Sequence, residues 1–94
     1  DQFLYQCDDT YITVCSDVFS SAFAPGVSAP QSLGLDPEVV LPLIKHVLRT
    51  RKVRGFDICE ISPRFDQDNT TANLGAVIIF AVVNTLCRLN GLGI

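Results

Sequence analysis

The feature that most constrains the fold is a pair of apolar, β-branched runs separated by one amphipathic segment. Residues 11–16 and 53–61 read as strands, and Pro63 ends the second. Between them, Asp36 and Pro37 open a helix. Its apolar face comprises Val39, Val40, Leu43, Ile44, Val47 and Leu48. A connection this long predicts parallel pairing in a right-handed β-α-β unit.

A second helix is expected at residues 72–89, which are apolar almost all round. The run at 77–83 could form a strand by local propensity, but its length and flanking caps favour a buried helix. Asn69 or Thr70 is the expected N-cap, and Asn90 with Gly91 the C-terminal stop. The order β-α-β-α predicts an α/β fold with parallel strands that are buried on both faces.

Two parallel strands leave sheet edges without partners, so a larger sheet or a second copy is expected to complete the fold. The 94 residues make a single, partial domain, and their 48% hydrophobic content favours a homo-oligomer or another partner. The net charge of −3 disfavours a nucleic-acid partner. The basic residues near position 50 are expected to complement a helix dipole. They are Arg49, Arg51, Lys52 and Arg54.

The four cysteines have irregular spacing and form no CxxC pair, which favours free thiols in a reducing cytoplasm over a disulfide framework. The longest apolar run, 76–83, is shorter than a membrane span, so no membrane association is expected. The sequence starts at Asp1 and holds no methionine, which suggests a fragment or a processed product.

Candidate ligands lie where the two strands end. Cys15 and Asp17 lie at the C-terminal end of the first strand, and the two-residue strand period would put both on one side, facing one metal ion. The competing interpretation is a buried thiol beside an aspartate that caps the loop. Glu60 lies at the end of the second strand, so it should lie near Asp17, where it could bind a cationic amidine or act in proton transfer. Its alternative is an ion pair with Arg64.

Other titratable groups receive structural interpretations. Asp57 should point away from Glu60 and bond backbone or a neighbouring helix. His46, the single histidine, falls on the polar flank of the first helix and is expected at the surface. The segment 66–69 lacks the glycine and distal glutamate of a calcium loop, so a helix-capping turn is favoured.

Three segments carry a family resemblance: Thr-Val-Cys-Ser-Asp-Val-Phe from Thr13, Ala-Phe-Ala-Pro-Gly-Val-Ser-Ala-Pro from Ala22, and Gly-Phe-Asp-Ile-Cys-Glu-Ile-Ser-Pro from Gly55. They resemble the C-terminal third of the arginase/agmatinase (ureohydrolase) family over residues 11–89. The second segment, with Gly34 to Pro37, looks most like the branch that acts on formimidoylglutamate. The resemblance implies a three-layer α/β/α fold, of which this chain would be a β-α-β-α fragment.

The resemblance further implies two manganese ions bridged by a hydroxide that attacks the amidine carbon, releasing glutamate and formamide. The family's Ser/Thr-x-Asp-x-Asp motif falls on Thr13, Cys15 and Asp17. Asp17 then matches a metal ligand, Cys15 replaces the usual bridging aspartate, and Glu60 matches the substrate-contacting glutamate. The family's other ligands, a histidine and an Asp-x-His-x-Asp segment, are absent from the 94 residues. The chain alone is therefore expected not to hydrolyse substrate, and a non-catalytic α/β module that self-associates or binds a protein remains the alternative.

Overall fold

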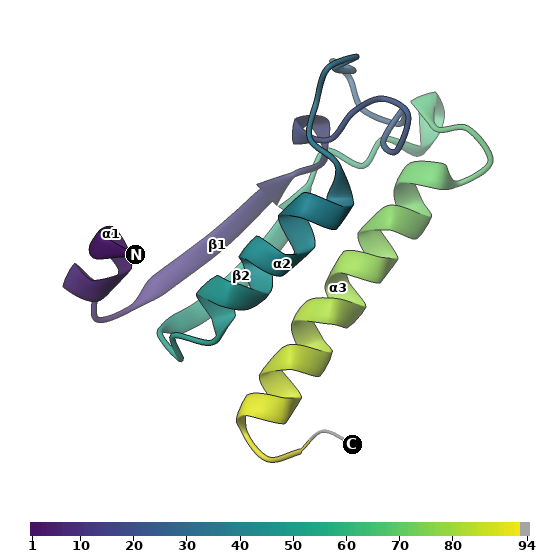
Figure 1. Ribbon diagram of the computed structural model, residues 1–94. Coiled ribbons are helices and arrows are strands. Elements are labelled where there is room, and N and C mark those ends of the chain that lie inside the picture. The colour runs from purple at the N-terminus through teal and green to yellow at the C-terminus, as the bar shows by residue number, and fades with distance from the viewer. Residues whose placement is uncertain (93–94) are drawn as a thin grey trace.

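The structure is a computed structural model that describes residues 1–92. The chain runs through α1 (Gln2–Gln6), β1 (Thr10–Cys15), α2 (Pro37–Leu48), β2 (Val53–Cys59) and α3 (Thr70–Leu89). Short 3-10 turns follow each strand, at Ser16–Val18 and Pro63–Phe65. Figure 1 shows the two long helices beside the paired strands, with the irregular loops gathered at one end. The predicted order β-α-β-α is confirmed after the short α1.

The two strands pair in parallel, with Cα partners running from Thr10 and Val53 to Cys15 and Cys59. This confirms the predicted pairing but moves two strand ends. β1 stops one residue early because Ser16 enters the 3-10 turn. β2 stops at Cys59, not at residue 61, because Glu60 turns the backbone into the left-handed region at φ 62°. Both strands therefore end at the same edge of the sheet, the carboxyl edge.

One face of the sheet carries the hydrophobic core. Ile12 and Val14 of β1 and Ile58 of β2 pack there against both long helices. The buried apolar members of this cluster are Val14, Phe19, Ala24, Ile44, Leu48, Ile78 and Val82. Because α2 and α3 share this face, the chain supplies two layers of the expected three-layer fold.

The other face of the sheet is polar and exposed, which corrects the expectation of strands buried on both faces. Tyr11 is 63% exposed, and its ring covers Gly55, where a Cβ would lie 2.5 Å from the ring. The Tyr11 hydroxyl and Thr13 Oγ1 donate to the Asp57 carboxylate at 2.7 and 2.6 Å. These bonds lower the pKa of Asp57, Thr13 contributing more than Tyr11. Asp57 is structural as predicted, but it bonds side chains of β1, not backbone or a helix.

Helix α2 begins as predicted, since the Asp36 carboxylate accepts the Glu38 N–H at 2.8 Å. Its buried stripe differs from the predicted one: Pro37, Ile44 and Leu48 are buried. Val39 and Leu43 are 58% and 59% exposed. The predicted face was therefore too wide, because this chain provides no layer to cover its outer half.

Helix α3 is helical throughout, which confirms helix over strand at residues 77–83. Asn69 occupies the N-cap position as predicted, but it adopts φ 61° and its side chain makes no cap bond. The Asp66 side chain makes the cap bonds instead, accepting the N–H groups of Thr71 at 2.9 Å and Ala72 at 3.1 Å. The positive φ angles at Asp68 and Asn69 fold the chain back so that Asp66 reaches the helix.

Only one stripe of α3 is buried, which corrects the expectation of a helix buried all round. Four residues form that stripe: Thr71, Gly75, Ile78 and Val82. Phe80 is 70% exposed, and Val77 and Val83 are each 53% exposed. By length and composition α3 could cross a membrane. The apolar-run argument against a membrane therefore does not hold for this helix, although its buried stripe packs into the core.

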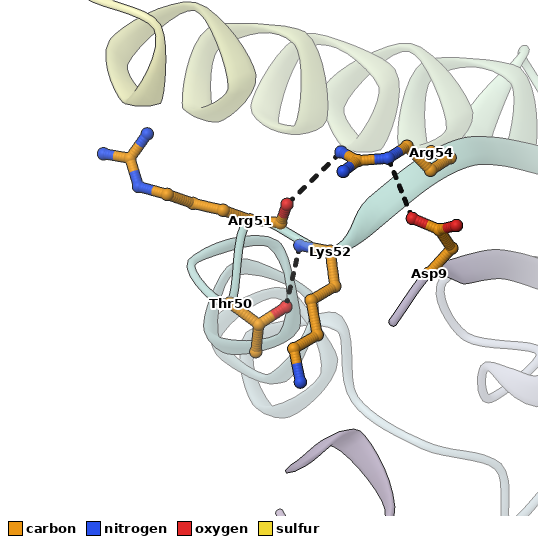
Figure 2. Close-up of polar contacts among 5 residues, drawn as sticks. All are labelled: Asp9, Thr50, Arg51, Lys52 and Arg54. Carbon is orange, nitrogen blue, oxygen red and sulfur yellow. Dashed lines mark hydrogen bonds and ion pairs between the residues drawn. The ribbon is translucent and has the colours of Figure 1, made fainter. Parts of the chain in front are cut away.

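The opposite, amino edge of the sheet holds three of the four basic residues, Arg51, Lys52 and Arg54 (Figure 2). Arg51, at φ 63°, donates to the Leu89 carbonyl at the C-terminus of α3. Arg54 bonds Asp9 at 3.0 Å and the Arg51 carbonyl at 3.3 Å. Lys52 donates to the Leu4 carbonyl at 2.6 Å. Arg51 thus complements a helix C-terminus as expected, but that of α3 and not of α2.

A candidate metal centre at the carboxyl edge

The 3-10 turn after β1 brings Cys15 and Asp17 together. The strand period used to predict this does not apply, because Ser16–Val18 leaves the extended conformation. The turn nevertheless lets the Cys15 thiol donate to the Asp17 carboxylate, which is the main cause raising the pKa of Cys15 to about 11. Burial and the thiol of Cys59 raise that pKa further. Cys15 therefore keeps its proton at neutral pH unless a cation displaces it.

Cys59 joins the site although sequence reasoning passed over it. It lies directly opposite Cys15 in the parallel register. Its thiol donates to the Val14 carbonyl at 3.7 Å, so the sulfur leans toward β1. The strand register was the missing information, since spacing alone does not say which residue of β2 faces Cys15.

Glu60 follows Cys59 at the same edge, with its backbone in the left-handed region. A non-glycine residue held at positive φ is strained, and such strain gathers at functional sites. Ser28 Oγ donates to Glu60 Oε2 at 3.2 Å. Among residues 1–92 Glu60 forms no ion pair with Arg64, whose guanidinium instead lies 5.6 Å from the Phe65 ring centre.

The loop that carries Ser28 is closed on itself at its base. The Ser20 N–H donates to the Leu35 carbonyl at 3.0 Å, and the Leu35 N–H to Val18 at 2.8 Å. The Ser21 N–H donates to the Gln31 carbonyl at 2.8 Å. Phe19, Ala24 and Val27 are buried. The loop is therefore a folded unit and not a slack connection.

Gly26 fixes this loop to the rest of the molecule. Its N–H donates to Thr71 Oγ1 at 2.7 Å in a buried bond, and its carbonyl accepts the Ser62 N–H at 2.6 Å. A Cβ at Gly26 would lie 2.7 Å from the Asp66 side chain, so a larger residue would not fit. Gly26 thus joins the loop to the first turn of α3 and to the segment after β2, which sets Ser28 beside Glu60.

An open apolar groove runs along β1 and α2 and ends at the site. Cys15 and Asp17 line its end, and no residue of β2 takes part. The other lining residues are Ile12, Thr13, Val14, Val18, Leu35, Val40, Leu43 and Ile44. The groove lies on the side of β1 that has no neighbouring strand in the described range 1–92.

The donor set suits manganese only in part. The Asp17 carboxylate is a hard oxygen ligand of the kind Mn²⁺ prefers, whereas the Cys15 thiol is soft and retains its proton. Within residues 1–92 no group of three or more His, Cys, Asp or Glu side chains gathers closely enough to hold a metal. His46 contributes nothing, since it lies at the surface 2.8 Å from Asp1, as predicted.

A family model described as the arginase family matches residues 1–84. The chain belongs to the arginase family. The formimidoylglutamase of Clostridium tetani is 63% identical over 94 residues, which are 100% of this chain and 28% of that protein. This arginase-family chain thus spans little more than a quarter of the curated relative it matches.

Solved structures of the family share the fold. The formimidoylglutamase of Bacillus subtilis matches 87% of this chain and 26% of its own, with a TM-score of 0.81 and 26% identity. The agmatine ureohydrolase of Thermoplasma volcanium matches 100% of this chain and 32% of its own, with a TM-score of 0.82 and 28% identity. The resemblance seen in the three motifs is therefore confirmed, as is the fold as a fragment of the arginase-like α/β fold.

Proposed function

We propose that this chain forms the carboxyl-edge portion of the active site of a hydrolase that cleaves formimidoylglutamate to glutamate and formamide. The single observation that carries the proposal is the 63% identity to the Clostridium tetani formimidoylglutamase along the whole chain. That span includes Asp17 and Glu60 at one sheet edge, where parallel α/β folds bind ligands.

Each residue at this edge has a role in the proposal. Glu60 binds the cationic formimidoyl group through charge-assisted hydrogen bonds, and Ser28 holds its carboxylate in place. Asp17 supplies a carboxylate ligand to a metal ion. Gly26 and Thr71 keep the loop at the distance that lets Ser28 reach Glu60.

Manganese is the proposed cofactor, with two ions expected in the complete site. Asp17 fits that ion, but Cys15 does not fit it while protonated, and residues 1–92 do not complete a metal shell. We therefore propose that the chain alone does not turn over substrate. The exposed apolar face of α3 supports association with further protein, and a homo-oligomer is retained as a proposal. The four free cysteines fit a cytoplasmic location.

A chimera tests the proposal directly. Residues 1–94 replace the matching segment of the Clostridium tetani formimidoylglutamase, and formamide release from formimidoylglutamate is measured with manganese present. We expect turnover by the chimera and none above a metal-only blank for the isolated chain. A folded chimera that binds manganese but releases no formamide would refute the proposed activity. Turnover by the isolated chain would refute the incomplete site.

A further inference from the structure

Two thiols from neighbouring strands face each other at the carboxyl edge. Cys15 and Cys59 are direct partners in the parallel register. Neighbouring strands lie about 4.8 Å apart, within the range of about 4.4–6.8 Å that a disulfide spans between Cα atoms. The Cys59 sulfur already leans toward β1, 3.7 Å from the carbonyl oxygen of Val14, the residue before Cys15.

The two sulfurs differ in exposure. Cys59 is exposed, whereas Cys15 is half-buried beside Asp17. The exposed sulfur is the one that a small oxidant reaches first, and the other lies next to it as a resolving thiol. The remaining cysteines lie elsewhere: Cys7 precedes β1 at the amino edge, and Cys87 is in the last turn of α3.

We propose that Cys15 and Cys59 are a modification site, closing to a reversible disulfide when the protein meets a peroxide. The bond would remove the Cys15 thiol as a candidate metal ligand. It would also link the ends of β1 and β2, which lead into Asp17 and Glu60. The disulfide itself is argued from the strand register, the position of the Cys59 sulfur and the exposure of the thiols, and only its effect on metal binding rests on the proposed function.

The chemistry balances with hydrogen peroxide as the named oxidant. The Cys59 sulfur attacks one peroxide oxygen, the O–O bond breaks, and a sulfenic acid and one water form. The Cys15 sulfur then attacks the sulfenic sulfur and expels hydroxide, which takes up the thiol proton and leaves as a second water. Two electrons pass from the sulfurs to the peroxide.

The test oxidises the full 94-residue chain with hydrogen peroxide, blocks the remaining thiols, and maps the peptides by mass. We expect the reactive thiols to fall from four to two, with a linked Cys15–Cys59 peptide that dithiothreitol releases. Cys59→Ser should abolish the linked peptide. Cys87→Ser, which removes a thiol outside the sheet, should leave the peptide unchanged. Far-UV circular dichroism of each variant confirms that it folds.

Three outcomes would overturn the proposal: over-oxidation of Cys59 without a link, a link that includes Cys7 or Cys87, or a disulfide between two chains. Because the assay contains neither metal nor substrate, it is independent of the hydrolase activity. Manganese binding before and after oxidation is then measured on the chimera. An unchanged affinity for manganese would refute the proposed effect on the metal centre but would leave the disulfide itself unaffected.

Discussion

The two ends of the sheet use charge in opposite ways. At the amino edge, Arg51, Lys52 and Arg54 bond the chain's own carbonyls and Asp9. At the carboxyl edge, the side-chain partners of Asp17 and Glu60 among the first 92 residues are a thiol and a hydroxyl. Within residues 1–92 the ion pairs join Asp9 to Arg54 and Asp1 to His46, and neither includes Asp17 or Glu60.

This difference separates structural charge from charge that is open to a ligand. The cations of the amino edge have a structural role, because they donate hydrogen bonds to carbonyl oxygens of helices and of the loop before β2. At the carboxyl edge, neither carboxylate has a cationic partner in the described part of the chain, and the neighbouring loop is held by a buried hydrogen bond from Gly26 to Thr71. A fixed scaffold with open carboxylates is the arrangement that a cationic ligand or metal requires.

The largest expected effect comes from removing the charge of Glu60. Glu60→Gln in the chimera should lower kcat/KM for formimidoylglutamate by about 100-fold, since losing one partner of a charge pair costs roughly 2–5 kcal/mol. Steady-state formamide release measures it. Asp8→Asn, the same change at the amino edge, is the matched control and should leave kcat/KM unaltered. An equal loss of kcat/KM in both variants would show that the carboxylates of the two edges do not differ in function.

A smaller effect is expected from the bond that fixes the carboxyl-edge loop. Thr71→Val leaves the buried Gly26 N–H without its acceptor, which should lower the free energy of unfolding by about 1–3 kcal/mol. Urea unfolding followed by circular dichroism measures it. Thr85→Val in the same helix removes a hydroxyl that donates only to the Ala81 carbonyl, so its loss should be clearly smaller. A larger loss for Thr85→Val would show that the loop is not anchored through Thr71.

The smallest expected effect concerns acid stability at the start of α3. Burial acts to raise the pKa of Asp66, but the N–H groups of Thr71 and Ala72 outweigh it and lower that pKa below 3.8. The stabilisation is therefore present above pH 3.8 and is lost as pH falls through the lowered folded-state pKa.

Asp66→Asn should reduce the melting temperature at neutral pH and flatten its decline in acid. Melting curves between neutral pH and pH 2 measure this, with Asp68→Asn in the same turn as the control. An acid decline as steep in Asp66→Asn as in the unmodified chain would assign the acid sensitivity to other carboxylates.

Local features of the fold were predictable, while features set by distant partners were not. Asp36 caps α2 as expected because the capping bond spans two residues. The cap of α3 was assigned to Asn69 or Thr70, because the positive φ angles that bring Asp66 into place leave no clear trace in the sequence. The outer half of α2 is exposed because residues 1–92 provide no layer that covers it.

The candidate site divides in the same way. Cys15, Asp17 and Glu60 were selected because strand ends can be recognised in the sequence, and the structure places all three where β1 and β2 end. Ser28 and Cys59 were missed as partners, since the loop fold and the strand register bring them in from 32 and 44 residues away. The roles of Cys15, Asp17 and Glu60 in binding metal or substrate remain predictions.

The left-handed backbone at Glu60 sets stability against the proposed function at a single residue. Glycine would adopt that conformation freely, yet it would delete the carboxylate at the carboxyl edge. Selection for a sturdier fold and selection for ligand recognition would thus favour different residues at this position. In a laboratory evolution experiment that selected for heat resistance alone, we would look first at position 60. A mutation there could raise thermal stability and abolish the proposed activity.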